Sequence, residues 1–143
     1  MSAKPRVLAL FISVDNEKKR ADKEKLELDE KGVLEDKFYA KNANRLILIT
    51  SATAYALAKS SGVELEYGGL GENVLVDQNI NQLVTGDRFK IGEVLLEVTQ
   101  NCTLCNGLSV IDPRLPEILK NDRGFFAKAI TNGIVKKDDI IIM

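Results

Sequence analysis

The rhythm of the chain after Gly62 constrains the fold most strongly. Short apolar segments alternate there with Gly, Asp and Asn residues at spacings of about ten residues. This pattern is typical of a β-barrel or β-sandwich. The Asn-Gly pair at 132–133 favours a type I′ hairpin. We expect strands near residues 73–77, 87–91, 93–100, 125–131 and 138–142.

The chain before Gly62 adds two strands and a helix. Residues 7–14 are a continuous run of strand length, rich in β-branched and aromatic residues, which predicts a strand buried on both faces. Residues 44–50 (NRLILIT) predict a second buried strand. Ser51 is a candidate N-cap for an alanine-rich helix that ends at Gly62. A short helix is expected after Pro116. The predicted fold class is mostly β (α+β): a curved sheet or barrel of mixed and antiparallel strands with a few packed helices.

Charge and length limit the organisation and the partners. The 143 residues fit a single domain over residues 1–143, with 20 Lys+Arg against 21 Asp+Glu. Residues 15–31 hold six basic and seven acidic side chains with no evident apolar stripe, which predicts a solvated loop or frayed helix. Without a basic excess, we expect no nucleic-acid partner.

The composition also excludes several chemistries. The chain has no histidine, so a histidine general base, a Ser-His-Asp triad and a histidine-ligated zinc cannot form within it. Catalysis would have to use thiols, carboxylates, Lys, Arg, Tyr or a bound cofactor.

The apolar segments are too short for a membrane. The longest weakly polar stretch, residues 46–58, is 13 residues long, whereas a spanning helix needs about 20. The apolar run at 7–14 passes into charged residues without a cleavage site, and with only two cysteines we expect no disulfide framework. We therefore expect no membrane partner and a cytoplasmic location.

Residues 68–105 carry an ordered set of motifs. They are Gly-Gly-Leu-Gly-Glu-Asn at 68–73, Thr-Gly-Asp at 85–87, Ile-Gly-Glu at 91–93, Leu-Leu-Glu-Val-Thr-Gln at 95–100 and Cys-Thr-Leu-Cys at 102–105. This order resembles the MOSC domain family, found at the C-terminal end of molybdenum cofactor sulfurases and as small stand-alone bacterial proteins. Weaker similarity extends over nearly the whole chain. The resemblance implies a MOSC-like barrel.

The resemblance also implies a function. Such proteins bind the molybdenum cofactor (molybdopterin), or carry sulfur as a cysteine persulfide for cofactor sulfuration. The family cysteine corresponds to Cys105, as sulfur carrier or as molybdenum ligand in a reductase component. A MOSC-like chain of this length leaves no room for a pyridoxal-phosphate site, so the implied partners are a cysteine desulfurase-type sulfur donor and a recipient molybdoenzyme.

Individual residues support parts of this interpretation. A thiolate at Cys105 would be a good nucleophile, sulfur acceptor or soft-metal ligand. Glu72 and Asn73 are candidate cofactor contacts in the glycine-rich segment. Arg45 and Arg123 are the best-placed cations for a pterin phosphate, because guanidinium groups bind phosphate well. Weaker candidates are Lys41, Arg88, Arg114 and Lys128, while Asp36 and Asp87 are interpreted as turn residues.

Two alternatives stay open. A non-catalytic module could keep the fold and only bind a cofactor or partner, which agrees with the absence of the family's Pro-Arg before Cys105. A thiol-redox protein could instead use Cys102 and Cys105 as a pair. In a purely structural interpretation, the cysteines are packing residues and the glycine cluster is a tight turn.

Overall fold

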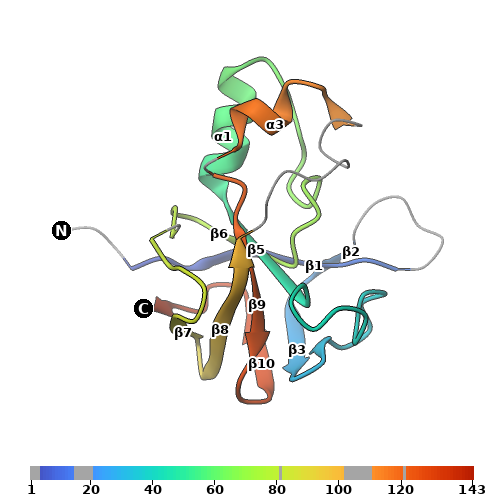
Figure 1. Ribbon diagram of the computed structural model, residues 1–143, viewed down its shortest axis with the longest axis vertical. Helices are drawn as coiled ribbons and strands as arrows, with labels where there is room; N and C mark the ends of the chain where they lie inside the picture. The colour runs from blue at the N-terminus through green and yellow to red at the C-terminus, as the bar shows by residue number, and fades with distance from the viewer. Residues whose placement is uncertain (1–3, 15–20, 81, 102–110, 121) are drawn as a thin grey trace.

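The computed structural model describes residues 4–14, 21–80, 82–101, 111–120 and 122–143 (Figure 1). Cys102 and Cys105 lie outside the described residues, as does the first part of the charged segment, residues 15–20. Within the described ranges, no helix is long and apolar enough to cross a bilayer.

Strands dominate the chain, as predicted. The elements in chain order are β1 (Val7–Ile12), β2 (Ala21–Lys23), β3 (Lys25–Asp29), β4 (Gly32–Val33), β5 (Ile47–Ser51), α1 (Ala52–Ser60), β6 (Val74–Val76), β7 (Arg88–Ile91), β8 (Val94–Asn101), α3 (Leu115–Ile118), β9 (Phe125–Ala129), β10 (Gly133–Lys136) and β11 (Ile141–Ile142). The predicted helix between Ser51 and Gly62 is confirmed as α1, and the short helix around Pro116 as α3.

The strands form one large curled sheet and one small one. The eight-stranded sheet has the order β11-β7-β8-β9-β5-β6-β1-β2, and β10-β3-β4 form the second. β5 and β6 run parallel, while the other described strand pairs are antiparallel. Arg6 and Ile140 form an antiparallel bridge, and the Val7 N–H donates to the Asp139 carbonyl at 2.9 Å. These contacts join β1 to the segment before β11, so the large sheet curls into the expected barrel-like fold.

The continuous apolar runs of β1 and β5 are explained by cover on both faces. In β1, Leu10 and Ile12 belong to the main core, while Ala9 and Phe11 belong to a second core formed with the helices. Successive side chains of a strand point to opposite faces, so a strand covered on both sides needs apolar residues throughout. Figure 1 shows α1 and α3 next to each other at one end of the molecule.

The charged segment corrects one prediction. Residues 21–29 form β2 and β3 instead of a loop or frayed helix. Leu26 and Leu28 are buried, whereas Lys25 and Glu27 between them are exposed. This alternation of period two is the apolar stripe of a half-buried strand. Two leucines among many charged residues are too short a pattern to indicate a strand by themselves. The strand is formed through pairing with β10.

The predicted type I′ hairpin at the Asn-Gly pair, residues 132–133, is also wrong. A type I′ turn needs a positive φ at both central residues, and neither residue has one. Strand β10, which begins at Gly133, pairs with β3, placing Val135 opposite Leu26. The predicted strand at 138–142 is confirmed only as the short β11.

Candidate functional site

A cavity of about 640 Å³ opens at one end of strands β5 and β9. Its walls come from the segment between β4 and β5, the glycine-rich segment before β6, and the start of β9. The lining residues are Ser13, Lys37, Phe38, Lys41, Asn42, Arg45, Leu46, Leu48, Glu66, Tyr67, Gly68, Gly69, Leu70, Gly71, Asn73, Arg123 and Phe126.

The lining is strongly cationic. Four of the lining residues are basic, namely Lys37, Lys41, Arg45 and Arg123, and one, Glu66, is acidic. The Arg45 guanidinium carbon lies 4.9 Å from the centroid of the Phe126 ring, close enough for a cation–π interaction. Clustered charges of one sign in a concave site concentrate the field and attract the opposite charge. The cavity is therefore suited to an anionic ligand.

Arg123 is the most unusual of these cations. Its side chain is buried, with the residue 5% exposed, and Nη2 donates to the Leu70 carbonyl at 2.6 Å. Its Nε and Nη1 are also buried, and neither finds a hydrogen-bond partner in the part of the chain that the structure describes. Leaving buried donors unsatisfied costs roughly 1–3 kcal/mol, and more for charged groups. The two nitrogens are thus donors at a cavity wall to which the described residues offer no acceptor.

The backbone around Arg123 is held by a close approach. Gly124 has a φ of +113°, and a Cβ built there would lie 2.2 Å from the Ile49 carbonyl oxygen. Only glycine tolerates both conditions. The Thr50 hydroxyl also donates to the Arg123 carbonyl at 2.8 Å. Arg123 is therefore fixed against β5, where its side chain can reach the cavity.

Asn73 lines the cavity but uses its amide within the fold. Its Oδ1 accepts the Leu48 N–H at 3.0 Å, and its Nδ2 donates to the Phe11 carbonyl at 3.2 Å. Nδ2 also approaches Asp36 Oδ1 at 3.4 Å. The side chain thus links β5 to β1, and a ligand contact would have to share these same atoms.

Glu72 lies behind the glycine-rich loop and is not among the lining residues. Its carboxylate is fully buried and accepts the Tyr55 hydroxyl at 2.6 and 2.8 Å and the Gly68 N–H at 3.1 Å. The Tyr55 oxygen in turn accepts the Leu70 N–H at 3.1 Å. Burial, reinforced by the charge of Glu72, raises the pKa of Tyr55 well above its usual range. The phenol therefore stays protonated and keeps donating to Glu72.

The remaining candidate cations are occupied by carboxylates. Arg88 and Lys128 both pair with Glu97, at 3.1 and 3.6 Å. The hydrogen bond from Arg88, helped by the charge of Lys128, lowers the pKa of Glu97. Neither cation lines the cavity.

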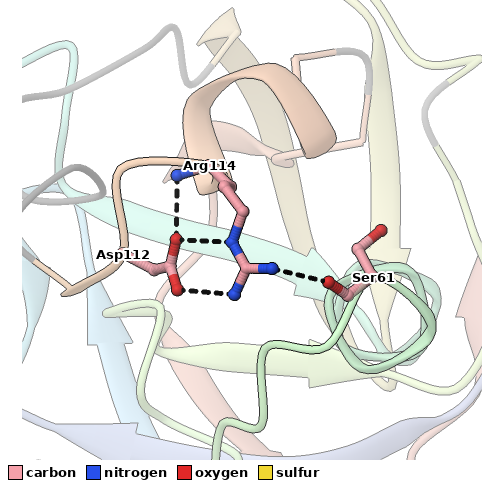
Figure 2. Close-up of polar contacts among 3 residues, drawn as sticks. All are labelled: Ser61, Asp112 and Arg114. Atoms are coloured by element: carbon pink, nitrogen blue, oxygen red, sulfur yellow. Dashed lines mark hydrogen bonds and ion pairs between the residues drawn. The ribbon is translucent and has the colours of Figure 1, made fainter.

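Arg114 is held even more completely (Figure 2). Its Nε and Nη2 donate to the two carboxylate oxygens of Asp112 at 3.1 and 3.0 Å, and Nη1 donates to the Ser61 carbonyl at 3.0 Å. These bonds lower the pKa of Asp112 and raise that of Arg114. They tie the chain just before α3 to the end of α1.

The two aspartates bond to backbone, as interpreted from the sequence. Asp36 accepts the N–H groups of Ser13 and Phe38 at 2.6 and 3.0 Å, and Asp87 accepts that of Val84 at 3.0 Å. Lys37, next to Asp36, is a lining cation that the sequence reasoning missed. Its position directly after a turn aspartate was the available signal.

The predicted thiols can be related to the site only through the chain. β8 ends at Asn101, which pairs with Phe125, two residues from Arg123. Cys105 follows four residues later, and four residues of chain span at most about 14 Å. Within residues 4–14, 21–80, 82–101, 111–120 and 122–143, no group of three or more His, Cys, Asp or Glu residues is arranged to hold a metal.

Several solved structures share the fold of this chain. Similar solved structures include the YuaD protein of Bacillus subtilis, with a TM-score of 0.85, 18% identity, and coverage of 97% of this chain and 94% of that one. YiiM of Geobacillus stearothermophilus has a TM-score of 0.77, 13% identity, and coverage of 96% and 74%. YiiM of Escherichia coli has a TM-score of 0.68, 20% identity, and coverage of 96% and 68%.

At these identities the solved structures establish the shared fold. No curated protein sequence matches the chain. The family model for the MOSC domain matches residues 35–141, which include every lining residue of the cavity except Ser13. By this match, and in agreement with its barrel-like fold, the chain belongs to the MOSC domain family.

Proposed function

We propose that the cavity binds the anionic, phosphate-bearing molybdenum cofactor, and that Cys105 serves this cofactor in the cytoplasm as a sulfur carrier or as a molybdenum ligand. The observation that carries the proposal is Arg123, a buried guanidinium at the wall of a cationic cavity, with two nitrogens that have no partner in the part of the chain described here. A bound oxyanion would satisfy these nitrogens and balance their charge.

The residues present fit the anionic part of such a ligand. Arg123 would donate from Nε and Nη1 while Nη2 stays on Leu70, and Arg45, Lys37 and Lys41 would add positive charge around it. Phosphate oxygens bind several donors at once, and charge-assisted hydrogen bonds are roughly twice as strong as neutral ones. The cofactor would supply the molybdenum at which sulfur is received or an oxygenated substrate is reduced.

Cys105 would contribute the sulfur chemistry. Its thiolate would attack the outer sulfur of a persulfide on a cysteine desulfurase-type donor, forming a new S–S bond while the donor thiolate leaves. The resulting persulfide would then be passed toward a recipient molybdoenzyme. Nearby cations stabilise a thiolate, and Arg123 lies two residues from Phe125, the strand partner of Asn101.

The test is intact-mass and elemental analysis of protein purified without reductant from cells that make the cofactor. We expect an added mass of about 32 Da, one sulfur atom, or stoichiometric molybdenum in the wild type. Either should disappear in Cys105→Ala, and molybdenum should also fall in Arg123→Met. Cys102→Ser should behave as the wild type.

Other outcomes would assign the alternatives. If neither the wild type nor Cys105→Ala gains sulfur or molybdenum, even after incubation with a persulfide donor or with the cofactor, the proposal is wrong. A non-catalytic binding module is then the remaining interpretation. A thiol-redox pair would be indicated instead if Cys102→Ser lost function and the wild type showed a reversible loss of about 2 Da, the two hydrogens released when a disulfide forms.

A further inference from the structure

Glu72 and Tyr55 form a buried polar pair behind the cavity wall and are not among the residues that line it. We propose that Tyr55 and Glu72 are positioning residues that hold the Arg123 guanidinium toward a bound oxyanion. This inference rests on the proposed function for the identity of the oxyanion, whereas the positioning itself can be measured without a ligand.

A continuous series of hydrogen bonds connects the pair to Arg123. The Tyr55 hydroxyl donates to Glu72 and accepts the Leu70 N–H at 3.1 Å. The Leu70 carbonyl then accepts Arg123 Nη2 at 2.6 Å. Leu70 is therefore held on its N–H side by Tyr55 and on its carbonyl side by Arg123, so its position depends on both.

Burial makes this series specific. Tyr55, Leu70, Glu72 and Arg123 are all buried. Where water cannot replace a lost partner, a hydrogen bond is stronger and an unmade one is costly. A shift of the Leu70 carbonyl would leave a third Arg123 nitrogen without an acceptor, so the loop and the guanidinium favour one arrangement.

The pair also anchors the loop that carries Leu70. Gly68 and Gly71 have positive φ values of +88° and +87°. Glycine adopts positive and negative φ values about equally readily, so the residue type alone does not fix this conformation. Glu72 accepts the Gly68 N–H at 3.1 Å, before Leu70 in the chain, while Tyr55 holds Leu70 itself. The loop also has two backbone hydrogen bonds of its own, from the Gly69 N–H to the Glu66 carbonyl at 2.9 Å and from the Gly71 N–H to the Gly68 carbonyl at 3.0 Å. The bonds to Glu72 and Tyr55 add to these and attach the loop to the buried pair.

The charge of Glu72 is kept away from Arg123. No ion pair involves either residue among the described residues, and the bonds to Glu72 come from a phenol and a backbone amide. Among the described residues, the hydrogen bonds that link Glu72 to Arg123 pass through Tyr55 and end at the neutral Leu70 carbonyl. The guanidinium is oriented while its charge stays available for a ligand.

The first test uses the ligand-free protein. Nitrogen-15 NMR of arginine side chains reports the Arg123 Nε–H signal, which is assigned by its loss in Arg123→Lys. Tyr55→Phe removes one hydroxyl and keeps the ring. We expect its Arg123 Nε–H to exchange with water about tenfold faster than in the wild type, the factor that corresponds to about 1.4 kcal/mol. Glu72→Gln keeps an acceptor oxygen for Tyr55 and should show a smaller increase.

The matched control is Tyr39→Phe. Tyr39 also donates its hydroxyl to a carboxylate, that of Asp29 at 2.5 Å, and it is not a lining residue. It loses the same chemical group at a site without a link to Leu70. The Arg123 signal should therefore exchange in Tyr39→Phe as in the wild type.

The second test titrates inorganic phosphate into the same proteins and follows the Arg123 signal. Tyr55→Phe should bind phosphate about tenfold more weakly than the wild type, with Tyr39→Phe unchanged. The positioning role would be overturned if Tyr55→Phe and Glu72→Gln both kept the Arg123 exchange rate and the phosphate affinity of the wild type. If phosphate leaves the wild-type Arg123 signal unmoved, the proposed anion site fails, and the exchange rates still decide whether Tyr55 and Glu72 position the guanidinium.

Discussion

Arg123 and Arg114 are the same residue type in opposite situations. Arg123 is buried at the cavity wall, and among the described residues its side chain makes one hydrogen bond, to the neutral Leu70 carbonyl. Arg114 is more than half exposed in its side chain and donates from two nitrogens to Asp112 and from a third to the Ser61 carbonyl (Figure 2). All three Arg114 nitrogens are satisfied, whereas two Arg123 nitrogens have no partner among the described residues.

This contrast shows that the surroundings of a cation, more than its type, decide whether it can bind a ligand. A guanidinium that already holds a carboxylate with two nitrogens has little charge or geometry left for another anion. A buried guanidinium that holds only a carbonyl keeps its full charge in a medium where charge interactions are strong. Arg114 therefore ties two segments together, and Arg123 is the ligand-binding candidate.

The largest expected effect comes from the glycine that places Arg123. Gly124→Ala combines a positive φ with a Cβ 2.2 Å from the Ile49 carbonyl oxygen. We expect the free energy of unfolding to fall by about 3 kcal/mol or more. Urea denaturation would measure it. Gly86→Ala is the control, since its φ is also positive at +94° but nothing lies within 4 Å of the added Cβ. Equal losses in the two variants would contradict the close approach at Gly124.

The next effect separates the two arginines directly. Phosphate at a hundred times its dissociation constant should stabilise the wild type by about 2.7 kcal/mol. Arg123→Met should abolish this stabilisation and Arg114→Met should retain it, because Arg114 is occupied by Asp112. Thermal unfolding with and without phosphate provides the measurement. Retained stabilisation in Arg123→Met would mean that the other cavity cations suffice.

Alkaline pH probes the support behind Arg123. Because the pKa of Tyr55 is raised in the folded state, the unfolded chain releases this proton first, near the ordinary tyrosine pKa of about 10. Above that pH the unfolded state binds fewer protons, so stability must fall as pH rises. The wild type should lose about 1.4 kcal/mol per pH unit more than Tyr55→Phe above pH 10. Parallel pH profiles would show that Tyr55 titrates normally.

The smallest effect is expected at the Arg114 pair. Bonds from Arg114 lower the pKa of Asp112, so this carboxylate stabilises the fold above its ordinary pKa, and that contribution is lost as pH falls through the lowered value. Asp112→Asn should therefore be slightly less stable than the wild type at neutral pH and equal to it in strong acid. Phosphate affinity should be unchanged. A weakened phosphate response would contradict the separation of the two sites.

Much of the fold was predictable because its signals are local. The apolar runs that became β1 and β5 are long enough to indicate strands covered on both faces. The alanine-rich stretch before Gly62 indicated α1 by composition and by its terminating glycine. The charged residues 21–29 were misjudged because two alternating leucines become a strand only through β10, more than a hundred residues later in the chain.

The site divides in the same way. The sequence pointed to Arg45 and Arg123, and the structure places both at one cavity. It offered Arg88, Arg114 and Lys128 in the same terms, although all three pair with carboxylates. Glu97 reaches both Arg88 and Lys128 because β8 lies between β7 and β9. Such pairing across strands joins residues that are separated in the sequence, so no local sequence pattern predicts it.

The sequence by itself determined the mostly β fold class, the helix α1 and the MOSC motif order, because each depends on residues close together in the chain. Only the tertiary structure decided that two Arg123 nitrogens find no partner among the residues it describes, that Arg114 is fully paired and that Glu72 lies behind the cavity wall. Those outcomes depend on which residues become neighbours when the sheet curls. Burial and hydrogen-bond partners arise only in that folded arrangement.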